Sequence, residues 1–243
     1  MAGSTSGDGH ARRACYLKAM AARIDIMELL QRPATEVAPF LLGALVRHET
    51  AEGAVVVRLT EVEAYLGPRG SADPDPGSHS YGGRTERNSA MFGPPGRLYV
   101  YFSYGMHFSA NLVCRPEGLS SGCLLRAGEI MAGVELARSR RPTAKSDVEL
   151  AQGPARLAKA MGFAREHNGM PALGGEVTVT LPDVPAGHVL TGPRVGISGP
   201  GGTADYPWRF WLGGEPTVSK FRPGAVRSPR PGGPAVRNTR SAR

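Results

Sequence analysis

Apolar residues follow helical spacing in some parts of this chain and strand spacing in others. From 24 to 47 they recur every three or four residues, which predicts helical turns bounded or kinked by Pro33 and Pro39. Residues 54–66 alternate with a period of two and predict one long strand, followed by a turn-rich stretch at 67–83. The amino-terminal third therefore predicts helical turns, then a strand, then an irregular segment.

The predicted strand 54–66 places polar and apolar side chains on opposite faces. Alternate residues of a strand share a face, so Glu61, Glu63 and Tyr65 project to one side. The other side is apolar and carries Val56, Val62 and Ala64. Two carboxylates and an aromatic ring on one strand face are a candidate site.

Short strands and helices are mixed in the rest of the chain. The predicted strands are 97–113 (one or two strands, with a bend at Gly105), 123–127, 177–181 and 208–212. The predicted helices are 129–141 and 154–161, the second with Pro154 in its first turn. Because strands and helices do not alternate regularly, we expect an α+β fold. It is a single domain with a curved, mostly antiparallel β-sheet flanked by helices.

The two ends of the chain differ in composition from its middle. Residues 1–24 and 220–243 lack apolar periodicity, so we expect a disordered N-terminal extension and a basic disordered tail around a folded domain at 25–219. The net charge is +8, and the tail alone carries seven basic residues and no acidic one. Such ends bind polyanions through phosphate contacts or serve as solubilising tails, and charge alone does not decide between these readings.

Several classes of protein are disfavoured by composition. No apolar run approaches the roughly 20 residues of a membrane-spanning helix, so we expect no membrane partner. The three cysteines form no CxxC pair, which indicates neither a disulfide framework nor a zinc knuckle and favours a reducing compartment. We expect a cytoplasmic protein, nucleoid-associated if bacterial, with an organellar or nuclear location left open. No metal-ligand cluster is evident, and neither a metal nor another cofactor is expected.

The block from 61 to 126 departs from ordinary core composition. It interleaves acidic, aromatic, histidine and amide side chains, and Arg126 at its end, with many glycines. No lysine occurs between Lys18 and Lys145. Aromatic rings beside a carboxylate and an arginine suit a site that holds a flat heterocycle and attacks next to it.

Several separated motifs, inside this block and after it, form a pattern that spans about residues 25–219. They are EVEAYLGP at 61–68, SHS at 78–80, RTERN at 84–88, MF at 91–92, GRLYVYFSYGM at 96–106, Asn111, LLRA at 124–127, GPARL at 153–157, PRVGI at 193–197 and PWRF at 207–210. In this order they resemble the 3-methyladenine (alkyladenine) DNA glycosylase family. The resemblance implies a monofunctional DNA glycosylase that flips alkylated or otherwise damaged purines out of duplex DNA. It would hydrolyse their N-glycosidic bond as a monomer and so initiate base excision repair.

The resemblance assigns the catalytic roles to Glu63 and Arg126. Glu63 would be the general base that activates water, and Arg126 would help to hold that water and the flipped nucleotide. A nearby carboxylate can take the proton of the water and stabilise an oxocarbenium-like transition state. Glu61 shares the strand face and is the rival base, but the family pattern singles out the acid that precedes Ala-Tyr.

The resemblance also assigns a base pocket. Tyr65, His79 and Tyr101 would be its aromatic walls, and Asn111 would crowd the exocyclic amine of guanine. A structural role for Asn111 at a strand end stays open. The segment between Tyr65 and His79 is longer than in the compact family form, with the Asp-Pro-Asp-Pro-Gly stretch at 73–77 as the extra residues.

Four further residues are assigned to DNA contacts. Tyr104 would wedge into the gap that the extruded nucleotide leaves in the duplex. Met91, Arg84 and Arg87 would contact the DNA that flanks the lesion.

Three other function classes fit the sequence less well. A zinc-dependent base deaminase needs an H-x-E helix and a P-C-x-x-C motif, and the sequence has neither. A bifunctional glycosylase-lyase needs a lysine to form a Schiff base, which the lysine-free central block disfavours. A non-catalytic module that binds damaged bases stays as the alternative, and the intact Glu63 argues against it.

Overall fold

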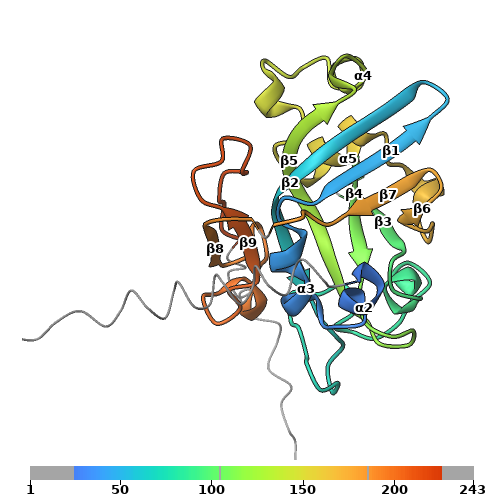
Figure 1. The fold of residues 1–243 in the computed structure, drawn as a ribbon. Helices are drawn as coiled ribbons and strands as arrows, with labels where there is room; N and C mark the ends of the chain where they lie inside the picture. The colour runs from blue at the N-terminus through green and yellow to red at the C-terminus, as the bar shows by residue number, and fades with distance from the viewer. Residues whose placement is uncertain (1–24, 104, 185, 226–243) are drawn as a thin grey trace, which may run out of the picture.

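The computed structural model describes residues 25–103, 105–184 and 186–225 (Figure 1). The predicted extension 1–24 and the tail beyond 225 lie outside these described residues. The predicted domain boundary near 219 stays a prediction, although past it the carbonyl of Arg222 accepts a hydrogen bond from the N–H of Gly196 (2.8 Å). No helix in the described part of the chain is long and apolar enough to cross a membrane.

One antiparallel sheet organises the described residues. Its strands, in spatial order, are β3 (Leu98–Ser103), β4 (His107–Val113), β5 (Gly122–Ala132), β2 (Gly53–Tyr65), β1 (Leu45–Thr50), β7 (Val177–Thr180) and β6 (Leu173–Gly174). The first half of β2 pairs with β1, and its second half pairs with β9 (Arg209–Leu212), which in turn pairs with β8 (Val189–Gly192). Figure 1 shows β1, β2 and β7 side by side, with β8 and β9 at the left edge.

Helices cover this curved sheet and complete its main apolar core. They are α2 (Ile26–Leu30), α3 (Ala34–Leu41), α4 (Val134–Arg140) and α5 (Pro154–Met161), with 3-10 turns η1 (Ser89–Phe92), η2 (Asp147–Glu149), η3 (Arg165–His167) and η4 (Pro200–Gly202). The buried side chains of α3 and α5 join those of β2, β4 and β5 in that core. The predicted α+β fold with a curved, mostly antiparallel sheet is confirmed.

Several predicted elements match the structure closely. The long strand predicted at 54–66 is β2, and the helix predicted at 154–161 is α5, with Pro154 in its first turn. The stretch predicted at 97–113 is the hairpin of β3 and β4, and Gly105 lies in its turn with a φ of 68°. Of the predicted site residues, Glu63 and Tyr65 lie on β2, and Tyr101 and Asn111 lie on the hairpin.

Helical turns were predicted throughout residues 24–47, and this prediction was wrong for the last residues of that range. The chain forms α2 and α3, and then reverses at Gly43, whose φ of 82° suits glycine. Residues from Leu45 onward form β1, which sequence reasoning missed and which lies between β2 and β7. Leu45 and Val46 fit a helical and a strand pattern equally well, so tertiary pairing decides their structure.

A helix was predicted at 129–141, and this prediction was wrong for the first residues of that range. Strand β5 continues to Ala132, because Glu129 and Ile130 pair with β2 and Arg58 binds the Glu129 carboxylate at 2.7 Å. The helix α4 begins only after Gly133, which has a φ of 73°. The strand predicted at 123–127 is therefore the middle of an 11-residue strand.

Irregular pairing between β2 and β5 curves the sheet and directs one functional side chain. Glu61 is paired with Ala127 and Val62 with Leu125, so Arg126 is the additional residue of a β-bulge. A bulge bends its strand and re-aims a side chain. Here the bulge turns the Arg126 guanidinium toward the carboxylates of Glu61 and Glu63.

Candidate active site

A cavity of about 400 Å³ opens where β2, β3, β4 and β5 meet the loops before η1 and after β8. This volume lies in the range of small-molecule sites, roughly 300–1,000 Å³. Seven residues predicted for the site line it: Tyr65, His79, Arg87, Met91, Tyr101, Asn111 and Arg126. Lining residues that sequence reasoning did not assign are Gly77, Tyr99, Ser103, Ser109, Leu124, Pro154, Val195, Gly196 and Ile197.

Glu63 lies fully buried directly behind the wall of this cavity. Its Oε2 accepts hydrogen bonds from the Tyr65 hydroxyl (2.8 Å) and from Arg126 (3.2 Å). Its Oε1 accepts the backbone N–H of Val195 at 2.6 Å. All three donor residues line the cavity, so they hold the carboxylate at the cavity edge without exposing it to bulk solvent.

Glu61 is equally buried but has a different environment. Its Oε1 accepts hydrogen bonds from Arg126 (2.9 Å), Arg209 (2.6 Å) and the Ser219 hydroxyl (3.0 Å). Its Oε2 accepts the N–H of Ser219 at 2.7 Å. Of these donor residues only Arg126 lines the cavity. The surroundings of Glu61 therefore indicate a structural role, which separates it from Glu63.

Arg126 joins the two carboxylates. Burial opposes its charge, but Glu63 and Glu61 outweigh that effect and raise the pKa of the guanidinium. Its third nitrogen donates to the Ser219 hydroxyl (3.2 Å). With hydrogen bonds to three residues, Arg126 is fixed in one orientation at the cavity wall.

Tyr65 forms one aromatic wall of the cavity and is a neutral phenol. Burial first and the Glu63 charge second raise its pKa well above the usual value. The guanidinium of Arg194 lies 4.6 Å from the centre of the Tyr65 ring and 5.1 Å from that of Trp208. The ring is therefore held from behind by a cation–π contact.

A second aromatic wall contains three rings. His79 packs edge-on against Tyr101, with 4.6 Å between ring centroids, and Tyr101 stacks on Tyr99 at 5.3 Å. The Nδ1 of His79 is 3.1 Å from the Tyr99 hydroxyl. Burial, and then the charge of Arg87, lower the pKa of His79, so this ring is neutral at pH 7. Tyr99 was missed, although it lies two residues before Tyr101 on the same face of β3.

Asn111 lies on β4 at the floor of the cavity and is 4% exposed. Its side-chain amide donates to the carbonyl of Tyr99 at 3.1 Å. This bond fixes the orientation of the amide relative to the cavity. Asn111 thus has a structural bond and a position on the lining, so both readings of this residue stay open.

The segment 73–77 is tied to the site by a buried ion pair that sequence reasoning missed. Both nitrogens of the Arg194 fork donate to Asp75, each at 2.6 Å, and neither side chain is exposed. Asp75 also accepts the backbone N–H groups of Leu66 (3.0 Å) and Gly77 (2.8 Å). This pair fixes the loop that leads to His79 and the chain that begins with Val195.

The residues predicted to contact DNA lie at different distances from the cavity. Met91 is buried on η1 and lines it, while Arg87 is exposed, lines it, and donates to the carbonyl of Phe102 (3.0 Å). Arg84 is exposed and outside the lining, with its guanidinium 5.9 Å from the centre of the Phe92 ring. Tyr104 lies outside the described residues.

Comparison with known proteins identifies the family. The family model described as "Methylpurine-DNA glycosylase (MPG)" matches residues 28–216. A relative from Streptomyces avermitilis is 53% identical over 199 residues, or 80% of this chain and 90% of the relative. One from Leifsonia xyli subsp. xyli is 51% identical over 191 residues (77% and 87%), and one from Nocardia farcinica is 46% identical over 221 residues (89% and 99%). Each is named "Putative 3-methyladenine DNA glycosylase".

These matches confirm the predicted enzyme class, a DNA glycosylase that hydrolyses N-glycosyl bonds in base excision repair. The chain belongs to the methylpurine-DNA glycosylase family.

Proposed function

We propose that the chain excises damaged purines from duplex DNA, and that the described cavity receives the flipped nucleotide. The observation that carries this proposal is the Glu63 carboxylate, buried at the edge of an aromatic cavity and held by three donors from its lining. A carboxylate beside a flat pocket suits hydrolysis at the anomeric carbon of a nucleotide whose base fills that pocket.

Glu63 acts as the general base in this mechanism. It takes a proton from a water molecule as that water attacks the anomeric carbon, while the bond to the purine breaks and the base leaves. The carboxylate also stabilises the positive charge that develops on the sugar ring. Because Glu63 is enclosed by Tyr65, Arg126 and Val195, the water it activates is shielded from bulk solvent. Arg126 orients the carboxylate and contacts the nucleotide.

The aromatic walls offset the cost of base flipping. Stacking a base on an aromatic side chain is worth about 1–3 kcal/mol, and unpairing and unstacking it costs a few kcal/mol, least for a damaged base. Stacking of the flipped base against Tyr65, His79 and Tyr101 is therefore sufficient to offset the free-energy cost of flipping. Selectivity then follows from how easily a base leaves the stack, and Asn111 adds a steric and hydrogen-bonding mismatch against normal guanine.

The exposed surface around the cavity would contact the duplex. Arg87 and Arg84 would bind phosphates that flank the lesion, and Met91, at the cavity wall, would also contact the flanking DNA. The family resemblance assigns the gap in the duplex to Tyr104. The basic tail 220–243 would add contacts that do not depend on sequence. We propose that the chain works as a monomer in the cytoplasm, where a bacterial nucleoid is accessible.

Release of free base tests the proposal. The purified chain is incubated with duplexes that carry one 3-methyladenine, 7-methylguanine, hypoxanthine or ethenoadenine, and free base is quantified by chromatography. We expect release from at least one duplex and none from undamaged DNA. Tight binding to a damaged duplex without release would instead support the alternative, a non-catalytic module that binds damaged bases.

A further inference from the structure

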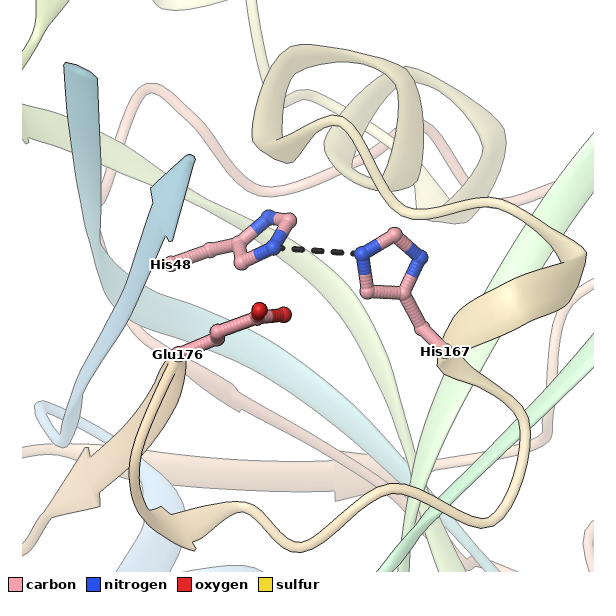
Figure 2. Close-up of side chains that lie close together, drawn as sticks. All are labelled: His48, His167 and Glu176. Atoms are coloured by element: carbon pink, nitrogen blue, oxygen red, sulfur yellow. Dashed lines mark hydrogen bonds between the residues drawn. The ribbon is translucent and has the colours of Figure 1, made fainter. Parts of the chain in front are cut away.

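Two histidines and a glutamate meet on the side of the sheet formed by β1 and β7. His48 lies on β1, His167 on η3, and Glu176 in the turn between β6 and β7. One ligand atom from each lies within 4.8 Å of the others. Figure 2 shows both imidazole rings and the carboxylate directed toward the same point. No metal-ligand cluster was evident in the sequence, where 119 residues separate the two histidines.

The spacing of the two imidazoles fits a shared metal ion. Their Nε2 atoms are 3.2 Å apart. Two ligands about 2.0–2.1 Å from a tetrahedral zinc ion lie about 3.4 Å from each other, as the tetrahedral angle requires. The separation of the two nitrogens is therefore already close to the one that a shared ion requires. Glu176 is exposed, so its side chain is free to move the last distance.

Hydrogen bonds behind the rings fix their orientation. The Nδ1–H of His48 donates to the carbonyl of Met161 at 2.7 Å, which leaves its Nε2 bare. Metal-ligating histidines are held by such a second bond. His167 accepts the N–H of Ala164 at its Nδ1 (3.0 Å), so its Nε2 carries the proton. Metal binding shifts that proton to Nδ1, where the Ala164 carbonyl is 3.3 Å away, at the cost of the bond from the Ala164 N–H.

The surroundings of the cluster are acidic. It opens into a cavity of about 340 Å³ that is also lined by Glu49, Glu52 and Glu166. One cation, Arg140, lines this cavity too, and its guanidinium is engaged by Glu52 at 2.8 Å. Glu49 is engaged in turn by Arg47, at 2.6 Å. The acidic field that favours a bound cation therefore comes mainly from Glu166 and Glu176.

We propose that His48, His167 and Glu176 bind one zinc-class divalent cation. Two imidazole nitrogens and one carboxylate oxygen suit Zn²⁺, whereas Mg²⁺ and Ca²⁺ prefer ligand sets made of oxygen. Solvent fills the remaining coordination position. This cavity and the candidate active site share no lining residue, so the ion has a structural role.

The bound ion would join three segments that are far apart in the chain. His167 precedes Asn168, whose side chain accepts the N–H of Val100 (3.0 Å) on β3, the strand that carries Tyr99 and Tyr101. An ion bound by β1, η3 and the β6–β7 turn therefore stabilises the segment that supports one wall of the catalytic cavity.

Zinc titration of the metal-free full-length chain tests this proposal. We expect one Zn²⁺ per chain by calorimetry, and at a hundredfold excess over Kd a Tm raised by about 5–10 °C. His167→Gln should abolish this binding. Glu176→Gln should weaken it at least tenfold. Glu166→Gln, which removes a carboxylate of the same cavity that does not ligate the ion, should weaken it much less.

Two results would overturn the proposal. One is a wild-type chain whose Tm does not respond to Zn²⁺. The other is zinc binding of equal affinity in the wild type and in Glu176→Gln, since the ion would then be elsewhere on the chain. If His167→Gln fails to fold, the exposed Glu176 still decides the question.

Discussion

Asp75→Asn should destabilise the protein strongly, although Asp75 belongs to a loop. Asp75 accepts two hydrogen bonds from Arg194 and one each from the N–H groups of Leu66 and Gly77, and both members of the ion pair are fully buried. Removing one partner of a buried pair typically costs about 3–5 kcal/mol, because the other charge is left uncompensated. Asparagine keeps one acceptor oxygen, so we expect about 3 kcal/mol.

Asp73→Asn is the matched control, because Asp73 lies in the same loop and also pairs with an arginine, Arg115. Its carboxylate is 40% exposed, and exposed pairs contribute about 0–1 kcal/mol. Urea unfolding and thermal unfolding, both followed by circular dichroism, give the free energy of unfolding and the Tm of both variants. A Tm decrease of about 6–12 °C is expected for Asp75→Asn in a domain of this size. Equal stabilities of the two variants would refute the assigned role of the buried pair.

Three further predictions concern chemistry, pH and DNA affinity. Base release should survive EDTA, because the described metal-ligand cluster is outside the catalytic cavity. The product should carry an intact abasic site, because the described residues that line that cavity include no lysine to form a Schiff base; a covalent adduct trapped by borohydride would contradict this second expectation. Burial, and then Arg87, lower the pKa of His79 below its usual 6.5, so below about pH 6.5 the unfolded chain binds more protons and the unfolding free energy falls. Denaturant titrations between about pH 7.5 and 5.5 should show a smaller fall in His79→Gln. Deleting 226–243 removes five arginines. The slope of log DNA affinity against log salt concentration should then fall by a few units, with little change in single-turnover base release. An unchanged slope would contradict a DNA-binding tail.

The sequence predicted those parts of the site that local pattern or motif determines. Period-two alternation placed Glu61, Glu63 and Tyr65 together, and the structure brings all three to one network around Arg126. The β-bulge that aims Arg126 was beyond prediction, because it depends on how two distant strands pair. Strand β1 was missed for the same reason.

The sequence also did not predict contacts between residues that are distant in the chain. Asp75 and Arg194 are separated by 119 residues, and so are His48 and His167. Arg194 lies within a recognised motif, but no local pattern connects it with an aspartate in a turn. Such contacts depend on the complete fold, so a single sequence does not reveal them.

Single-turnover base release by Glu63→Gln tests the central claim most directly. Glutamine keeps the shape of the side chain and an acceptor for Val195, but it cannot take the proton of water. With enzyme in saturating excess over a damaged duplex, we expect the rate to fall by about 10²–10⁴-fold while duplex affinity stays nearly unchanged. Glu61→Gln, checked for folding by circular dichroism, should lose less activity. A Glu63→Gln rate within tenfold of wild type, or a larger loss in Glu61→Gln, would contradict the assignment of Glu63 as the general base.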